Sequence, residues 1–451
     1  MSAHHIGRTL DPGEAFFFLA DRISCLNFVL MAERRGALDA ERIRAGLALL
    51  QRQNPLLRAK ISWTDETGLR FESATGATIE LECRETGAAD WQMCIERELA
   101  RPFAIGDAPL VRCQYLYWTG VDDALRSVLA LTFHHAIADG RSGGEMLRQL
   151  LDFLATGRAP EPHTAGAIPP MGDLFPARFH WSSQPESAKR VMEQMLSDYR
   201  RHGRVHRMPL LANTTADRSP RFIRLTLPPD VTQRLLVLSR KHGTSVHGAL
   251  CAAQLLAQFR VLADAEKNGE RGGEVGRQKE ALFLSCPVDM RPHLEPVPPA
   301  MPTGLYISLI SAAFALEPNT DFWTLAGEVI RQTRAQLARG EGHIFFNLYG
   351  LYNNPIAPGF EPAFSKALLA TLHHTAVSNI GRVATVDSDR AVESISFALC
   401  PMPYQALFSA VSTYQDRLIV NLNYDAGKLP AQIAEAIANT MRELLLQASE
   451  A

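Results

Sequence analysis

Apolar residues in the first third of the chain recur in short, bounded runs that alternate with amphipathic stretches. Residues 127–133 form one such run, SVLALTF, whose length and composition predict a buried strand. Residues 147–154 then carry leucine at helical spacing, which predicts a helix. The intervening segment, residues 134–140, is therefore expected at a strand-to-helix turn, where side chains can face a cleft.

Strand and helix patterns occur in two separate series. In the first, strands are predicted at residues 27–32, 56–63, 78–83 and 111–118. A helix with Asp39 as its N-cap is predicted over residues 39–53. The second series starts with a strand at 221–227 and helices at 229–241 and 246–262. Two such series predict a layered α/β protein with two similar lobes.

Proline and glycine separate the two series. Six prolines are spread between residues 160 and 185, a composition typical of a linker. We therefore divide the chain into a first lobe (1–160), a linker (161–190) and a second lobe (191–451). Residues 264–280 mix charges with glycine and are expected to form a surface loop.

The predicted turn at residues 134–140, HHAIADG, carries the candidate chemistry. A neutral histidine has a pKa of about 6.5 and can accept a proton near neutral pH. Asp139 has two possible roles: contact with an imidazole would orient the ring, as in a catalytic triad, whereas pairing with a distant arginine would fix the turn. Gly140 lacks a Cβ, so it can take positive φ and reverse the chain directly after the carboxylate.

Other interpretations of this turn stay open on the residues alone. Half-buried histidines and an Asp-Gly turn are common as packing features. A zinc site is less consistent with the pattern, because adjacent histidines on a strand point to opposite faces. A second doublet, His373-His374, competes for the role of base but lacks a following Asp-Gly.

Composition is that of a globular protein large enough for two cores. The chain has 451 residues, of which 46% are hydrophobic. Its net charge of -2 gives no electrostatic case for binding nucleic acid or an anionic membrane. No uncharged apolar run is long enough for a membrane span, and no signal-peptide pattern follows Met1. Seven scattered cysteines without a CxxC pair are expected to be reduced thiols, mostly buried, in a cytoplasmic protein.

The string HHAIADG resembles the HHxxxDG signature of the CoA-dependent acyltransferase superfamily. This superfamily includes peptide-synthetase condensation domains, polyketide-associated acyltransferases and alcohol acetyltransferases. Other segments resemble its "HPLLR", "VDLRP" and "SNxG" sequences: residues 54–58 (with Asn54 in place of histidine), 287–292 and 378–381. The resemblance covers nearly the whole chain.

The resemblance implies a fold and a place for the site. Two lobes related to chloramphenicol acetyltransferase would be arranged as a V, with a channel through their interface. Two substrates would enter from opposite mouths and meet at His135.

The resemblance also implies roles for individual residues. His135 would deprotonate a hydroxyl or amine as it attacks an acyl thioester, without a covalent acyl-enzyme. His134 would be structural, and Asp139 would pair with Arg291 to brace the loop. The co-substrate would be acyl-CoA or acyl-phosphopantetheine on a carrier protein, with no permanently bound cofactor and no metal.

Residues 378–381 are a candidate oxyanion-binding segment. They follow a strand predicted over residues 371–377, so donors on Ser378, Asn379 or Gly381 could face a developing alkoxide. The same sequence is also that of an ordinary turn between strands.

The branch of the superfamily is narrowed by what the sequence lacks. The plant-type string DFGWG does not occur, and residues 378–381 do not match the "NVPG" of wax ester synthases. A free-standing acyltransferase of the polyketide-associated or alcohol acetyltransferase type fits best. The alternatives are a stand-alone condensation enzyme that takes its donor from a carrier protein in trans, and a non-catalytic docking module of the same fold.

Overall fold

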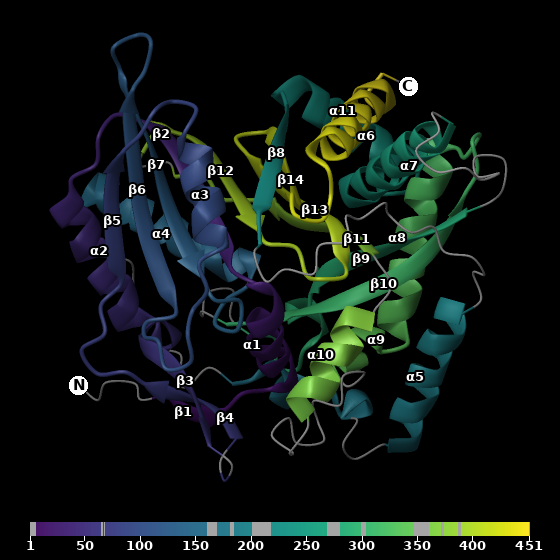
Figure 1. Cartoon of the computed structure of the whole chain (residues 1–451), viewed down its shortest axis with the longest axis horizontal. Helices are drawn as coiled ribbons and strands as arrows, with labels where there is room; N and C mark the ends of the chain where they lie inside the picture. Colours follow the sequence, from purple (N-terminus) through teal and green to yellow (C-terminus); the bar gives the residue numbers. More distant parts are fainter. Residues whose placement is uncertain are drawn as a thin grey trace.

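Two lobes stand side by side in the computed structural model of the chain, each built on its own large sheet (Figure 1). The predicted layered α/β class is thereby confirmed. The structure describes residues 6–64, 66, 68–159, 169–180, 185–200, 218–267, 280–298, 304–346, 360–370, 374–386 and 389–450.

The first lobe contains a five-stranded sheet. In spatial order its strands are β12 (Val392–Leu399), β2 (Phe28–Arg35), β7 (Leu125–Phe133), β6 (Val111–Thr119) and β5 (Glu80–Glu85). β7 pairs antiparallel with β2 and β6. It lies at the centre of the sheet, as its uninterrupted apolar sequence requires.

Helices cover both faces of this sheet, because side chains alternate along each strand. Leu30 of β2 joins the core under α4 (Gly140–Thr156) and α2 (Ala40–Gln53). The next residue, Met31, packs with α3 (Trp91–Leu99) on the opposite face. Asp39 caps α2 by accepting hydrogen bonds from the amides of Glu41 and Arg42, as predicted.

The second lobe contains a six-stranded mixed sheet. In spatial order its strands are β10 (Ile307–Leu316), β9 (Glu280–Asp289), β11 (His374–Arg382), β13 (Gln405–Tyr414), β14 (Arg417–Asp425) and β8 (Pro220–Leu227). Four helices lie on its outer face: α6 (Pro229–Lys241), α7 (Val246–Lys267), α8 (Phe322–Ala338) and α11 (Ala431–Ala448). The inner face of the sheet is turned toward the first lobe.

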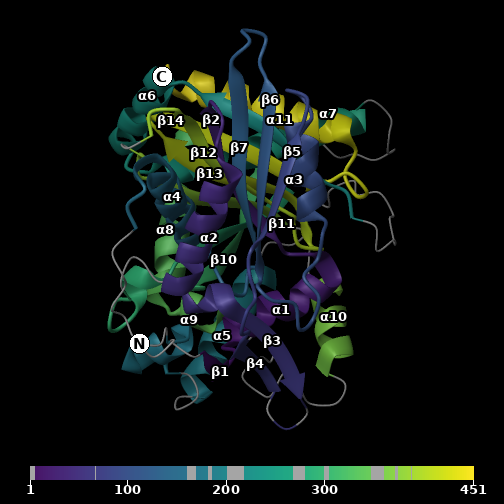
Figure 2. The same cartoon turned by 90° about the vertical axis from the view of Figure 1, so that its left-hand side faces the viewer.

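Smaller elements close one end of the molecule. A three-stranded sheet is formed by β1 (Gly7–Thr9), β4 (Gly68–Ser73) and β3 (Ala59–Thr64). It lies below the five-stranded sheet, at the same end as α1 (Pro12–Ser24), α5 (Pro185–Arg200), α9 (Glu341–Ile344) and α10 (Phe360–Ala370) (Figure 2).

One strand crosses between the lobes. β12 comes late in the chain but pairs antiparallel with β2, where Leu399 lies opposite Phe28. The sheet of the first lobe therefore includes a strand from the segment that we assigned to the second lobe, 191–451. A boundary drawn along the sequence misses this exchange, because strand pairing is a non-local contact.

The described part of the predicted linker, 161–190, is ordered by contacts with its surroundings. Residues 171–174 and 177–179 form 3-10 turns, and the amide of Met171 donates to Asp11 at 2.9 Å. α5 already starts at Pro185. Residues 160–168 and 181–184 lie outside the described residues.

Several element boundaries differ from the predicted ones. A 3-10 turn at Pro55–Arg58 precedes β3, so the strand predicted over 56–63 starts later. α7 continues to Lys267, so the surface loop predicted from residue 264 begins later, and residues 268–279 lie outside the described residues. Within α7, Val246–Asp264 is long and apolar enough to cross a membrane by composition, but 72% of its most apolar window is buried, as in a core helix.

Candidate active site

His135 lies in the turn between β7 and α4, and its side chain lines a cavity of about 470 Å³. Both large sheets contribute to the cavity wall. Phe28 and Phe397 come from the first sheet, and Leu309 and Phe408 come from the second. The cavity therefore lies at the interface between the lobes and has room for substrates that approach from either side of it.

Aromatic rings hold the His135 imidazole. Phe17 of α1 stacks on it with ring centroids 4.2 Å apart and an interplanar angle of 21°. The ring of Phe28 lies 4.7 Å away. Burial lowers the pKa of His135 from 6.5 to about 4, an effect that backbone hydrogen bonds and the charge of Asp139 partly oppose. The imidazole is neutral at neutral pH, which is the form that can accept a proton.

His134 points away from this cavity into the first lobe. It is buried, and its Nδ1 accepts a hydrogen bond of 3.0 Å from the amide of Ala136. Its Nε2 lies 3.7 Å from a carboxylate oxygen of Asp21, and the rings of Phe18 and Phe103 lie near it. Burial lowers its pKa. These contacts fix the backbone of the turn.

Asp139 is completely buried and accepts four hydrogen bonds. Its Oδ1 accepts from the amides of Arg141 and Ser142 at 3.1 and 2.9 Å, which makes it the N-cap of α4. Its Oδ2 accepts from Arg291 Nη2 at 2.9 Å and from the amide of Tyr306 at 3.0 Å. Although burial alone would raise the pKa of Asp139, the Arg291 charge and these hydrogen bonds hold it below its usual value.

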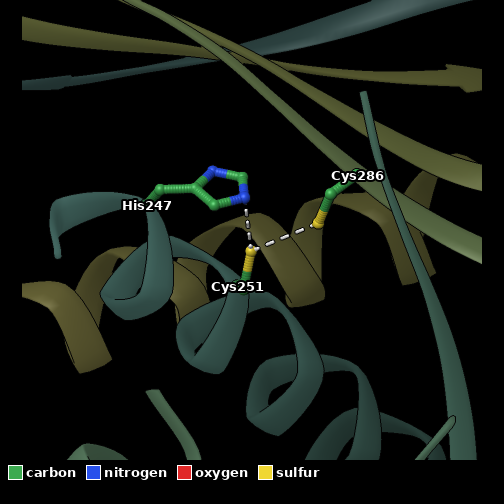
Figure 3. A group of neighbouring side chains, drawn as sticks. All are labelled: His247, Cys251 and Cys286. Atoms are coloured by element: carbon green, nitrogen blue, oxygen red, sulfur yellow. Dashed lines mark hydrogen bonds between the residues drawn. The ribbon is translucent and has the colours of Figure 1, made fainter. Parts of the chain in front are cut away.

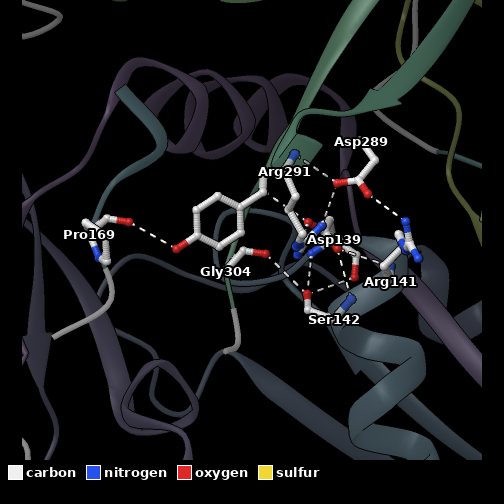
Figure 4. Close-up of polar contacts among 8 residues, drawn as sticks. Asp139, Arg141, Ser142, Pro169, Asp289, Arg291 and Gly304 are labelled. Carbon is white, nitrogen blue, oxygen red and sulfur yellow. Dashed lines mark hydrogen bonds and ion pairs between the residues drawn. The ribbon is translucent and has the colours of Figure 1, made fainter. Parts of the chain in front are cut away.

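Arg291 extends this network across the lobe interface (Figure 4). Its Nη1 donates to Asp289 at 3.0 Å, and Asp289 also accepts from Arg141 at 2.6 Å. The guanidinium lies over the ring of Tyr306 at 4.9 Å. Arg291 thus ties α4 of the first lobe to β9 and β10 of the second.

Gly140 is needed for a different reason from the one predicted. It is the first residue of α4 and is not among the glycines with positive φ. A Cβ at this position would lie 2.8 Å from Cγ2 of Ile380. The glycine therefore allows α4 to approach β11 closely, which no local sequence rule reveals.

The segment containing Ser378 and Asn379 also lines the cavity, but from within β11 rather than after it. The pairing of β11 with β13 shifts between Asn379 and Arg382, which marks a bulge. Asn379 Oδ1 accepts a hydrogen bond of 2.8 Å from the amide of Gly381, whose φ is +78°. The side chain of Asn379 therefore supports the bulge and lies beside the cavity.

The second histidine doublet is not brought to the site by any described contact. His373 lies outside the described residues, and only the backbone of His374 is described, at the start of β11.

Several residues that line the cavity could not be predicted from the sequence. Phe17 and Phe28 look like ordinary core residues, and their contact with His135 depends on tertiary packing. Arg141 and Arg382 line the cavity from exposed positions. Arg141 adjoins the motif, which is the one hint that sequence offered.

The chain matches two known families. Residues 18–262 match the family described as "Condensation domain", and residues 216–423 match "Phthiocerol/phthiodiolone dimycocerosyl transferase C-terminus". The chain is 26% identical over 325 residues to the phthiocerol/phthiodiolone dimycocerosyl transferase of Mycobacterium ulcerans (strain Agy99), with 69% of each chain covered. It is 27% identical over 319 residues to phosphinothricin tripeptide synthetase PhsC of Streptomyces viridochromogenes, covering 67% of this chain and 26% of that much longer one.

Solved structures share the fold over nearly the whole chain. Trichothecene 15-O-acetyltransferase TRI3 from Fusarium sporotrichioides superposes with a TM-score of 0.71 at 14% identity, covering 99% of this chain and 97% of the other. Polyketide synthase associated protein 5 from Mycobacterium tuberculosis gives 0.62 at 17% identity, covering 98% of each. The predicted two-lobed fold is confirmed by these similarities.

Proposed function

The chain belongs to the condensation-domain family and is a transferase, and we propose that it moves an acyl group from a thioester to a hydroxyl or amine in the cavity beside His135. The observation that carries this proposal is the neutral imidazole of His135, which contacts the rings of Phe17 and Phe28 on the wall of a cavity shared by both lobes. We propose further that donor and acceptor enter from opposite mouths of a channel between the lobes.

In this mechanism His135 removes the proton of the acceptor as its oxygen or nitrogen attacks the thioester carbonyl. A tetrahedral intermediate forms and collapses. The carbon–sulfur bond breaks, and the imidazolium returns the proton to the leaving thiolate. The acyl group thus moves from the thiol to the acceptor, and the proton moves from the acceptor to the thiol. No acyl-enzyme is required.

Ser378 and Asn379 are our candidates for stabilising the oxyanion. Both line the cavity, and Asn379 Oδ1 is engaged by Gly381, which leaves the amide Nδ2 as its donor. Loss of one oxyanion donor costs about 10²–10³ in kcat. We therefore expect Ser378→Ala to lower kcat by about 10²–10³-fold, and an unchanged kcat would remove Ser378 from this role.

The donor is acyl-CoA or an acyl group on the phosphopantetheine arm of a carrier protein acting in trans. Arg141 and Arg382, the two described arginines that line the cavity, are paired with Asp289 and Asp416. This pairing leaves little surplus positive charge for the several phosphates of CoA. The paired arginines therefore favour a carrier arm as the donor. We also propose that the enzyme acts in cytoplasmic secondary metabolism.

The decisive experiment is product analysis by mass spectrometry after mixing the protein with acyl-CoA or acyl-carrier protein and a panel of alcohols and amines. Transfer from the carrier but not from free CoA is expected, and rapid transfer from free acyl-CoA would overturn the carrier proposal. If no thioester is turned over while a carrier protein binds tightly, the chain is a docking module instead. If His374→Ala abolishes transfer and His135→Ala does not, the base is assigned to the wrong histidine.

A further inference from the structure

Three metal-ligating side chains meet on the far side of the second sheet from the cavity. His247 and Cys251 come from α7, and Cys286 comes from β9 (Figure 3). Cys251 and Cys286 are 0% and 3% exposed, whereas His247 is half-buried. The mechanism proposed above uses none of these residues.

Local geometry explains why the three side chains converge. His247 and Cys251 are four residues apart on one helix, so they lie on the same face. Side chains alternate along β9, and Cys286 therefore faces α7 while the next residue, Pro287, lines the catalytic cavity. The cluster is thus separated from the active site by the thickness of one sheet.

Two of the three distances between ligand atoms in the cluster match those around a tetrahedral zinc ion. Zinc lies about 2.3 Å from sulfur and about 2.0–2.1 Å from nitrogen, which places two sulfurs about 3.8 Å apart and sulfur and nitrogen about 3.5 Å apart. Cys251 Sγ lies 3.9 Å from Cys286 Sγ and 3.6 Å from His247 Nε2. All three ligand atoms lie within 4.8 Å of one another.

Charge also suits a divalent ion at this position. Two thiolates and a neutral imidazole compensate Zn²⁺ fully, so the occupied site places no net charge in the apolar core of the second lobe. A disulfide would need the sulfurs to approach to about 2.05 Å, whereas they lie 3.9 Å apart as free thiols.

We propose that His247, Cys251 and Cys286 bind one zinc ion that clamps α7 to β9. Binding releases the two thiol protons to the solvent, and the three protein ligands leave the fourth position for a water molecule. The sequence did not signal this site, because Cys286 lies far along the chain from the His-x3-Cys pair.

The test uses the full chain, reduced, stripped of metal and then titrated. With Zn²⁺ we expect one ion per chain by elemental analysis. With Co²⁺ we expect the thiolate-to-cobalt charge-transfer band and the intense visible bands of a tetrahedral site. His247→Gln and Cys286→Ala should each weaken binding by more than the 10–100-fold that loss of an outer-shell partner costs. Cys113→Ala, which removes a buried cysteine of the first lobe, should leave binding unchanged.

Outcomes of this test are distinct. His247→Gln alters a half-buried position and keeps the proposal testable if Cys286→Ala fails to fold. Absence of stoichiometric binding to the wild-type chain, or equal binding by His247→Gln, would overturn the proposal. So would a cobalt spectrum without the thiolate band.

Discussion

The two ends of the HHAIADG turn lie a few residues apart but have different surroundings. At the histidine end, His135 faces the cavity and makes ring contacts with Phe17 and Phe28. At the aspartate end, Asp139 is fully buried and saturated with hydrogen bonds. A single short motif therefore joins a side chain on the cavity wall to a buried polar anchor that does not line the cavity.

The largest effect is expected at the histidine end. His135→Ala removes the proposed base, so kcat should fall by about 10²–10⁴-fold, with little change in the free energy of unfolding. The matched control is His343→Ala, because burial lowers the pKa of His343 to about 4 as it does for His135, but His343 lies outside this cavity. Acyl transfer and urea denaturation would be measured on both variants. If His343→Ala lost as much activity as His135→Ala, the role proposed for His135 would be contradicted.

The aspartate end should respond in stability. Asp139→Ala leaves the Arg291 charge buried without its main partner, a change that costs about 3–5 kcal/mol. Asp39→Ala is a matched control, because Asp39 also caps a helix through two amides but is exposed; a lost cap costs about 0.5–2 kcal/mol. Equal losses in chemical denaturation would show that Asp139 acts as a helix cap and that its ion pair adds nothing.

Gly140 follows Asp139 at the last position of the turn, and its substitution should show a smaller effect. Gly140→Ala places a Cβ 2.8 Å from Ile380 and is expected to cost about 1–3 kcal/mol through overpacking. Gly144→Ala, in the same helix, places its Cβ 4.0 Å from Leu30 and is expected to be neutral or slightly stabilising. Thermal unfolding of the Gly140→Ala and Gly144→Ala variants separates the effect of the interlobe contact from that of helix propensity. Equal melting temperatures would contradict the expected overpacking at Gly140.

Sequence reasoning captured what is local in this comparison. The strand, the turn and the helix follow from periodicity, and the pairing of Asp139 with Arg291 was implied by resemblance. What it missed depends on contacts between distant segments: the approach of Ile380 to Gly140, the Phe17 ring on His135, and β12 in the sheet of the first lobe. Gly140 does not use the positive φ that a glycine can adopt, because it is the first residue of α4.

The acid limb of the pH profile gives the smallest and most specific test of the histidine end. Because burial lowers the pKa of His135 to about 4, its neutral form persists on acidification, and kcat/KM should fall by less than about 10% between pH 7 and pH 5.5. An ordinary histidine, with a pKa of about 6.5, would lose about 90% of its neutral form over that range.

The free energy of unfolding should also decrease as the pH falls. The unfolded chain binds a proton at His135 near pH 6.5 and the folded chain only near 4, so the stabilising preference for the neutral ring is present above pH 6.5 and is lost as pH falls through that window. His135→Ala should flatten this part of the curve of unfolding free energy against pH. An acid limb of kcat/KM centred near pH 6.5 would mean that the ring is solvated in the working enzyme and that its enclosure by Phe17 and Phe28 does not set its protonation.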